Sequence, residues 1–331
     1  MHKIGIVGGA GYIGSALSEY MCNTFRVRVI DKSLPPSNLK NKVEYQECDI
    51  RDYDELKRGL KDIDFVIHTA IVQIPLINEA RKLGYEVNFL GTQNVCKTVD
   101  ESPSIKGMIL SGTWHVFGEQ DLSGLIDEAF GFRPDKVEER ARLYCLSKIA
   151  QECIVRIFNE SSSKVYTIIR MGTVLGEGMP EKTAANIFIE KGLKGEPLTP
   201  YKHSMHRPML YVDIKDVCKA YKRLLERIME GSRQNHKRNS LDNVINLFWP
   251  KPLTILELSH IIKNLIVKYT NGQIEPPIKI LDVGLTSPYD EQGKEKLEVN
   301  VSKAEQLLNM KLINPKRSLE RMIKKKLSLE Q

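Results

Sequence analysis

The chain has 331 residues, with 41% hydrophobic residues, 27% charged residues and a formal net charge of +7. This balance is typical of soluble globular proteins and excludes a disordered, collagen-like or coiled-coil chain. At roughly 150 residues per domain the length favours two units, and the mild positive excess does not choose between a nucleotide ligand, a nucleic acid and neither.

The six cysteines are scattered and form no C-x-x-C pair, so neither a disulfide framework nor a metal site is expected. The first residues run straight into an apolar stretch that ends in glycines, without a cleavage-site pattern. No apolar run is long enough to span a bilayer. We therefore expect a reduced, cytoplasmic protein that does not cross a membrane.

Strand-like and helix-like segments alternate in the first half of the chain. The expected strands are short and rich in Ile and Val: Lys3–Val7, Arg26–Ile30, Val43–Gln46, Phe65–His68, Gly107–Ser111 and Val165–Arg170. The expected helices among them are Tyr12–Met21, Asp54–Leu60, Val87–Val99 and Tyr144–Phe158. This alternation predicts right-handed crossovers and a parallel sheet, which is the α/β class.

The alternation of strand-like and helix-like segments becomes less regular after Arg170, where Gly and Pro become frequent. Three further helices are expected, at Thr183–Leu193, Asp213–Met229 and Leu253–Val267. Asp213 is a plausible N-cap, and Thr254 with Glu257 fits a capping box.

Two polar segments lie in this second half. Residues Glu230–Asn243 have no periodicity and are expected to form an exposed loop. The tail Pro315–Lys326 is dense in Lys and Arg. A solvated helix face explains that tail better than contact with a membrane or a nucleic acid does.

A glycine-rich turn follows the first strand and opens the first helix, with the sequence Gly8-Gly9-Ala10-Gly11-Tyr12-Ile13-Gly14. Two registers fit, Gly9-x-Gly11-x-x-Gly14 and Gly8-x-x-Gly11-x-x-Gly14. In either register the glycines permit a tight turn, a close approach of the backbone to a pyrophosphate and close packing of helix on strand. Backbone N–H groups at the helix start would then face the phosphates. Glycine turns also simply link strands to helices, so the pattern alone is weak.

Asp31 strengthens the nucleotide interpretation, because it ends the second strand and lies 20 residues after Gly11. A carboxylate there accepts hydrogen bonds from ribose hydroxyls and repels a 2′-phosphate, which favours NAD over NADP. The neighbouring Lys32 could soften that preference, and an ordinary turn carboxylate is the alternative. Asp49 and Ile50 follow the third strand, where Asp49 could contact the adenine or cap the next helix.

Tyr144 and Lys148 are spaced i and i+4, which places them on one helix face. An ammonium beside a phenol lowers the phenol's pKa, so the pair can act as a general acid/base. Spacing of this kind also occurs in ordinary surface pairs. A third signal is the hydroxyl-rich turn that contains Ser111 and Thr113, which ends a buried-looking strand. Ligands of parallel sheets sit at such strand ends.

With these pieces in order, the sequence resembles the extended short-chain dehydrogenase/reductase family, in its NAD-dependent epimerase/dehydratase branch. The resemblance rests on motifs along most of the chain: Gly8–Gly14, His68-Thr69-Ala70, Val87-Asn88 through Gly91-Thr92, Ser111-Gly112-Thr113 through Val116-Phe117-Gly118, Tyr144 with Lys148, Arg207 through Asp213, and Val299 through Ala304. It implies a Rossmann-type doubly wound parallel sheet with a smaller C-terminal substrate-binding lobe. Residues 1–171 would bind NAD and carry the catalytic residues, segments at about 209–248 would return to that domain, and 172–331 would form most of the lobe.

The resemblance also assigns site residues. The catalytic residues would be Thr113, Tyr144 and Lys148. The cofactor would be held by Gly8, Gly11, Tyr12, Ile13, Gly14, Asp31, Asp49, Ile50, His68, Ala70, Asn88, Ser111, Tyr144 and Lys148. The substrate would contact Thr113, His115 and Arg207, with Arg207 on a nucleotide phosphate.

Two departures from the family pattern bear on the reaction. Dehydratases of this branch carry Asp-Glu directly after the catalytic Thr, whereas this chain has Trp114 and His115. The imidazole could act as an acid, but orientation or packing is the plainer role. A second phosphate-binding Arg usually precedes the late motif, and only Lys294 and Lys296 stand there. Lysine lacks the guanidinium fork that grips a diphosphate.

The sequence therefore predicts an NAD-dependent nucleotide-sugar epimerase that works by transient hydride transfer, with Tyr144 as the acid/base. The first alternative is a net NAD(P)-dependent oxidoreductase on a keto-sugar or another small alcohol or ketone. A sugar dehydratase and a non-catalytic NAD-sensing protein are weaker alternatives. A homodimer through helices around Asn88–Val99 and Tyr144–Phe158 is also implied by the resemblance, and no nucleic-acid partner is expected.

Overall fold

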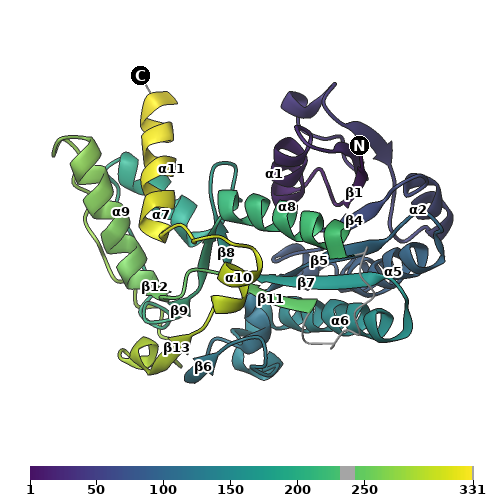
Figure 1. The fold of residues 1–331 in the computed structure, drawn as a ribbon. Helices are drawn as coiled ribbons and strands as arrows, with labels where there is room; N and C mark the ends of the chain where they lie inside the picture. Colours follow the sequence, from purple (N-terminus) through teal and green to yellow (C-terminus); the bar gives the residue numbers. More distant parts are fainter. Residues whose placement is uncertain (232–242, 330–331) are drawn as a thin grey trace.

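The computed structural model, which describes residues 1–231 and 243–329, contains a seven-stranded parallel sheet (Figure 1). The strand order is β11-β7-β5-β4-β1-β2-β3. The strands are β1 Lys3–Val7, β2 Arg26–Asp31, β3 Glu44–Glu47, β4 Phe65–His68, β5 Gly107–Thr113, β7 Val165–Met171 and β11 Val244–Leu247. The central strands β4, β5 and β7 are buried along their whole length, as expected of a sheet that is covered on both faces.

Helices cover both faces of the sheet. On one face lie α1 Tyr12–Met21 and α8 Ile214–Gly231; on the other lie α2 Tyr53–Gly59, α5 Thr92–Glu101 and α6 Glu139–Ser161. The α/β class with a Rossmann-like, doubly wound sheet is thus confirmed. The division of the chain at residue 171 stays a prediction.

Three further helices gather at one end of the molecule, on the left in Figure 1. There α7 Ala184–Leu193, α9 Ile255–Tyr269 and α11 Pro315–Leu329 pack together, with α10 Ser302–Leu307 nearer the sheet. The capping box of α9 is present as predicted, and Asp213 accepts a hydrogen bond from the Lys215 N–H at the start of α8.

Short strands join the loops of this half in three small sheets. β8 Thr173–Leu175 pairs with β10 Tyr211–Asp213, β9 Pro208–Met209 with β12 Leu253–Thr254, and β6 Gly124–Ile126 with β13 Leu297–Val299. With two or three residues each, they are too short to show the alternation that reveals a strand.

The expected helix Val87–Val99 begins earlier than the sequence suggested. α3 Leu76–Glu79 and α4 Arg81–Tyr85 precede a π-helical turn at Glu86–Gly91, which continues into α5. The first part is divided into two short helices and contains Gly84, a residue that disfavours helix, so it gives no continuous helical pattern. Short 3-10 helices lie at Ser37–Leu39, Trp114–Phe117, Pro134–Lys136 and Gly293–Lys296.

The two polar segments of the second half of the chain have different outcomes. Most of the expected loop Glu230–Asn243 lies outside the described residues. The basic tail forms α11, which buries Leu319, Met322 and Ile323, while its Arg321 pairs with Glu177 and Asp213. Among residues 1–231 and 243–329, no helix has the length and apolarity to cross a membrane. The six cysteines are free thiols.

A buried ion pair fixes α6 against the sheet. Arg170 on β7 donates from Nε and Nη2 to the two carboxylate oxygens of Glu152 on α6, at 3.0 and 2.6 Å. Both side chains are 1% exposed. The guanidinium also lies over the rings of Phe117 and Phe132. Because α6 carries Tyr144 and Lys148, this pair helps to set where they stand.

Replacing Glu152 with Gln should therefore lower the free energy of unfolding by about 3–5 kcal/mol, because the buried Arg170 loses its counter-charge. Urea unfolding measures the change. The control is Asp282→Asn, which breaks the exposed pair with Lys202 and should leave the unfolding midpoint in place. Equal effects of the two substitutions would contradict a structural role of the buried pair.

Candidate active site

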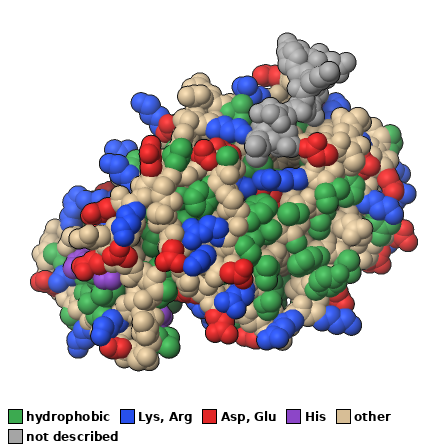
Figure 2. Space-filling model, turned by 90° about the horizontal axis from the view of Figure 1, so that it is seen from below, with side chains coloured by type: hydrophobic (Ala, Val, Ile, Leu, Met, Phe, Trp, Pro, Cys, Tyr) green, Lys and Arg blue, Asp and Glu red, His purple; other side chains and the backbone are tan. Residues whose placement is uncertain are grey.

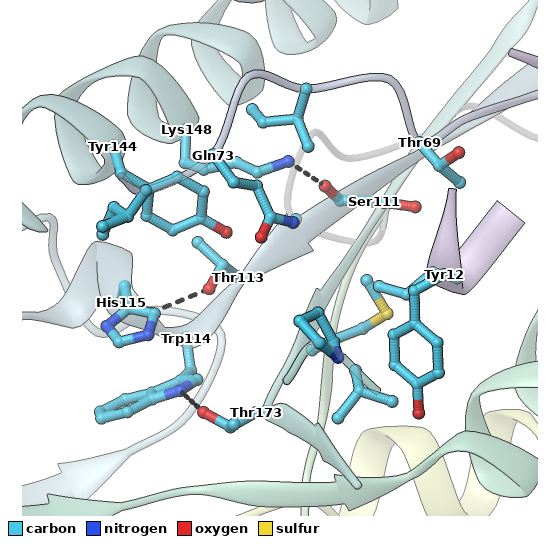
Figure 3. Close-up of a pocket in the computed structure, with 18 of the residues that line it drawn as sticks. Tyr12, Thr69, Gln73, Ser111, Thr113, Trp114, His115, Tyr144, Lys148 and Thr173 are labelled. Carbon is cyan, nitrogen blue, oxygen red and sulfur yellow. Dashed lines mark hydrogen bonds between the residues drawn. The ribbon is translucent and has the colours of Figure 1, made fainter. Parts of the chain in front are cut away.

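Two adjoining cavities lie at the carboxyl ends of the central strands. The larger, about 490 Å³, is bounded by the glycine turn, the ends of β2 and β3 and the loop after β4. We call it the glycine-turn cavity. The smaller, about 220 Å³, is bounded by the end of β5, by α6 and by residues of the 171–183 segment, and we call it the tyrosine cavity (Figure 3). Six residues line both cavities: Tyr12, Ile13, Thr69, Ile71, Gln73 and Pro180.

The glycine turn leaves no room for side chains at three of its positions, Gly8, Gly9 and Gly14. Gly8 has a φ of +81°, and a Cβ there would lie 2.4 Å from the Ala70 nitrogen. A Cβ on Gly14 would lie 2.2 Å from the Gly8 oxygen. Gly11 stands at the start of α1, and no side chain caps this helix. The turn thus presents the N-terminus of a helix to the cavity, as an anion site requires.

Asp31 lines the same cavity in a fixed orientation. Its Oδ2 accepts a hydrogen bond from the Ala10 N–H and its Oδ1 one from the Ser33 N–H, both at 3.0 Å. Each carboxylate oxygen keeps a further lone pair that can accept a hydroxyl hydrogen bond. Lys32, which could weaken a preference for NAD, is paired with Asp49 at 3.3 Å.

Asp49 and Ile50 also line the glycine-turn cavity. The hydrogen bond from Arg51 is the largest of the influences that lower the pKa of Asp49 to about 2. The alternative role of Asp49, as cap of the following helix, belongs instead to Asp52, which accepts a hydrogen bond from the Glu55 N–H at 2.8 Å.

His68 and Asn88 lie behind the cavity wall, and neither lines the two cavities. The His68 ring is fully buried, with Nε2 3.0 Å from the Thr92 hydroxyl. Burial, with the charge of Lys148, lowers its pKa to about 3, so the ring is neutral. The Asn88 side chain holds the backbone of Val72 and contacts the Ser147 hydroxyl. It thereby ties the loop after β4 to α6, while Ala70 of that loop lines the glycine-turn cavity.

Thr113, Tyr144 and Lys148 meet in the tyrosine cavity (Figure 3). Lys148 donates to the Ser111 carbonyl at 2.8 Å, and burial lowers its pKa to about 7. Burial raises the pKa of Tyr144 to about 12, while a hydrogen bond from Thr113 opposes the rise. The Ser111 hydroxyl lies 2.6 Å from that of Tyr221 on α8. The cavity therefore holds a phenol, a hydroxyl and an amine whose pKa is lowered to about 7.

His115 and Trp114 form one wall of this cavity. The two rings are stacked, with centroids 4.5 Å apart, and the Trp114 indole donates to the Thr173 hydroxyl at 3.3 Å. Gln73 and Thr173 also face the cavity, as Figure 3 shows, and nothing in the sequence pattern singled them out.

Arg207 does not line either cavity. Its guanidinium lies 2.8 Å from Glu138 and 3.5 Å from Glu119, which is 1% exposed. Burial would lower the pKa of Arg207, but these two carboxylates hold it above its usual value. Glu119 also lies 2.6 Å from His115, and sequence reasoning missed it. Its only signal was a spacing of four residues from His115.

The two lysines in place of a second arginine are engaged elsewhere. Lys294 pairs with Glu257 and Lys296 with Asp290. Neither lines the tyrosine cavity or the glycine-turn cavity.

Comparison with known proteins adds a family relationship. The model of the "NAD dependent epimerase/dehydratase family" matches residues 4–237. A Methanocaldococcus jannaschii protein named "Putative UDP-glucose 4-epimerase" is 30% identical over 269 residues, which is 78% of this chain and 81% of that protein. A decarboxylating sterol-4-alpha-carboxylate 3-dehydrogenase of Bos taurus is 26% identical over 58% of this chain and 51% of its own length.

The fold has a close counterpart among solved structures. The UDP-glucose 4-epimerase of Thermus thermophilus, solved in complex with NAD, superposes with a TM-score of 0.77 at 20% identity. The match covers 97% of this chain and 98% of the other.

Burial of Lys148 predicts a pH dependence of stability in the cofactor-free protein. Its pKa falls from 10.5 to about 7 on folding, so the unfolded chain holds an extra proton between these pH values. The free energy of unfolding contributed by Lys148 therefore rises as the pH rises from about 7 to 10.5.

Urea unfolding at several pH values of the wild type and of Lys148→Met tests this. The stability of the wild type relative to the variant should increase with pH across that window. Substituting the exposed Lys40 in the same way controls for the loss of one positive charge. A constant difference between wild type and Lys148→Met would show that Lys148 is not desolvated.

Proposed function

The chain belongs to the NAD-dependent epimerase/dehydratase family, and from this we propose that it is an epimerase of a nucleotide-activated sugar. The observation that carries the proposal is the meeting of Tyr144, Lys148 and Thr113 in a cavity that adjoins the glycine turn. The names of the relatives, which include UDP-glucose 4-epimerases, support the same substrate class.

The residues around the glycine-turn cavity fit NAD. The pyrophosphate would lie on the turn between Gly8 and Gly14, at the N-terminus of α1, which no side chain caps. The ribose hydroxyls near the adenine would bond to Asp31, whose carboxylate disfavours a 2′-phosphate. Bound NAD would supply a reversible hydride acceptor and, when oxidised, a positive ring that favours the phenolate of Tyr144.

The chain's own groups would then move the proton. Tyr144 would take it from a sugar hydroxyl as that carbon is oxidised, and would return it later. Lys148 would hold ribose hydroxyls and add positive charge beside the phenol. Thr113 would donate a hydrogen bond to the reacting oxygen. Return of the hydride to the other face of the keto-sugar would complete the epimerisation.

Elimination of water is disfavoured by the residue that follows Thr113. A departing hydroxyl needs a proton donor, and position 114 holds a fully buried indole whose N–H is already donated to Thr173. A non-catalytic NAD sensor is disfavoured because Tyr144, Lys148 and Thr113 are all present and face one cavity.

Arg207 would bind the substrate phosphates only by exchanging carboxylate partners. Glu138 and Glu119 offset its charge, and the two late lysines are also paired. This pairing favours a second candidate, a net oxidoreductase on a keto-sugar or another small alcohol or ketone. The similarity to a sterol dehydrogenase over part of the chain supports the same candidate.

We also propose a homodimer through the outer face of α5 and α6. Figure 2 views the molecule from this side and shows a broad hydrophobic area there. The exposed apolar side chains of this region are Tyr85, Leu90, Leu146 and Ile157. An apolar patch of this kind marks an interaction surface.

Replacing Tyr144 with Phe should lower the rate of epimerisation by about 10²–10⁴-fold, because the ring stays but the acid/base is lost. The assay supplies UDP-glucose and other nucleotide sugars and detects the isomers. The control is Tyr20→Phe on the exposed face of α1, which should keep full activity. If no sugar is epimerised and added NAD is reduced in stoichiometric amounts, the epimerase proposal fails in favour of the oxidoreductase.

Replacing Ile157 with Glu should dissociate the dimer, because Ile157 is 64% exposed in one chain and would be buried between two. Sedimentation velocity of the wild type and the variant measures the change. Leu285→Glu places the same charge on an exposed apolar residue of the other lobe and should leave the dimer intact. A monomeric wild type would contradict the dimer.

A further inference from the structure

Glu119 is a buried carboxylate that joins the tyrosine cavity to Arg207. One oxygen lies 2.6 Å from Nδ1 of His115. The other lies 3.5 Å from the Arg207 guanidinium and 3.4 Å from the Tyr289 hydroxyl. Burial would raise the pKa of Glu119, but Arg207 and His115 lower it to about 2. The group is therefore a carboxylate at neutral pH.

This carboxylate sets the state of the His115 ring. A carboxylate can only accept a hydrogen bond, so at 2.6 Å it favours the ring form with a hydrogen on Nδ1, which leaves the lone pair of a neutral ring on Nε2. His115 lines the tyrosine cavity, with 21% of its side chain exposed. Within residues 1–231 and 243–329, no side chain forms a hydrogen bond or ion pair with Nε2 of His115. The ring stands edge-on to that of Tyr144, with centroids 6.0 Å apart.

We propose that His115, oriented by Glu119, is a second acid/base that exchanges the hydrogen of a carbon next to the reacting carbon. The inference rests on the proposed function, which turns the reacting carbon into a carbonyl. Neighbouring carbons are only about 1.5 Å apart, so a base for the second carbon must face the same cavity as Tyr144. His115 meets that condition.

The step balances without any further reactant. The C–H bond beside the carbonyl breaks, its electron pair forms the C=C bond of an enolate, and the proton goes to Nε2 of His115. Tyr144 has by then taken a proton from the substrate, so it and Thr113 can both donate hydrogen bonds to the enolate oxygen. Nε2 exchanges this proton with water, and its return to the same face restores the ketone with a solvent-derived hydrogen on that carbon.

Exchange needs one acid/base, whereas loss of water needs a second acid at the departing hydroxyl. Trp114 offers no acid for a departing hydroxyl, as its indole N–H is held by Thr173. Glu119 is a positioning residue in this scheme, because it does not line the cavity and acts through the imidazole.

The test incubates the protein with NAD and UDP-glucose in heavy water and locates deuterium on carbon by NMR and mass spectrometry. Epimerisation by a returned hydride leaves every carbon-bound hydrogen unlabelled. We expect deuterium on a carbon beside the one oxidised. Reduced nicotinamide or epimer without such deuterium overturns this inference alone. Absence of reduced nicotinamide, epimer and deuterium overturns the proposed function and this inference with it.

The effect of the His115–Glu119 pair is separated from general damage when the deuterium uptake of each variant is divided by the amount of epimer formed. His115→Ala should lower this ratio by about 10²–10⁴-fold, and added imidazole should restore part of it. Glu119→Gln should lower the ratio too, because an amide does not enforce the ring tautomer.

The matched control is Glu138→Gln, which removes the same charge from the other partner of Arg207. Glu138 pairs with Arg207 and Arg140 and should leave the ratio unchanged. An unchanged ratio in His115→Ala, or equal losses in Glu119→Gln and Glu138→Gln, would overturn the assignment.

Discussion

The burial of Lys148 is the constraint on which the site depends. A lysine that is 5% exposed must find hydrogen-bond acceptors for its amine within the protein, and this amine reaches the Ser111 carbonyl at 2.8 Å. That bond requires α6 to lie close against the end of β5. The same contact places Tyr144, one turn earlier on α6, beside Thr113 at the end of the strand.

Other parts of the fold hold α6 in this place. Glu152 binds Arg170 on β7 within the core, and Ser147 contacts Asn88 from the π-helical turn. Asn88 in turn fixes the loop after β4 that lines both cavities. The helix is thus anchored by the side chains of Ser147, Lys148 and Glu152. A rigid anchor is what catalysis by positioned groups needs, since small displacements reduce rates steeply.

The other side of the tyrosine cavity is organised by charge. Arg207, Glu119 and Glu138 form a charge network at the edge of the cavity, and His115 connects this network to the cavity. Such a network is stable only while its charges are balanced. A phosphate that recruits Arg207 would have to compete with two carboxylates, so the network bears on which substrates the protein accepts.

Local patterns predicted much of this fold and site. The buried strands, the glycine turn, Asp31 and the Tyr144–Lys148 spacing each follow from a short run of residues with one physical reason. Glu119, the capping role of Asp52 and the buried positions of His68 and Asn88 did not follow, because they depend on contacts between segments distant in sequence or on competition between neighbouring acids. The two- and three-residue strands could not be predicted, because they are too short to show an alternation of apolar and polar residues.

The most direct measurement follows one deuterium placed on the reacting carbon of UDP-glucose during turnover in ordinary water. Hydride transfer to bound NAD and back, assisted by Tyr144, predicts an epimer that keeps the label on that same carbon. An epimer that has lost the label to solvent, or label that accumulates in free reduced cofactor without an epimer, would contradict the account.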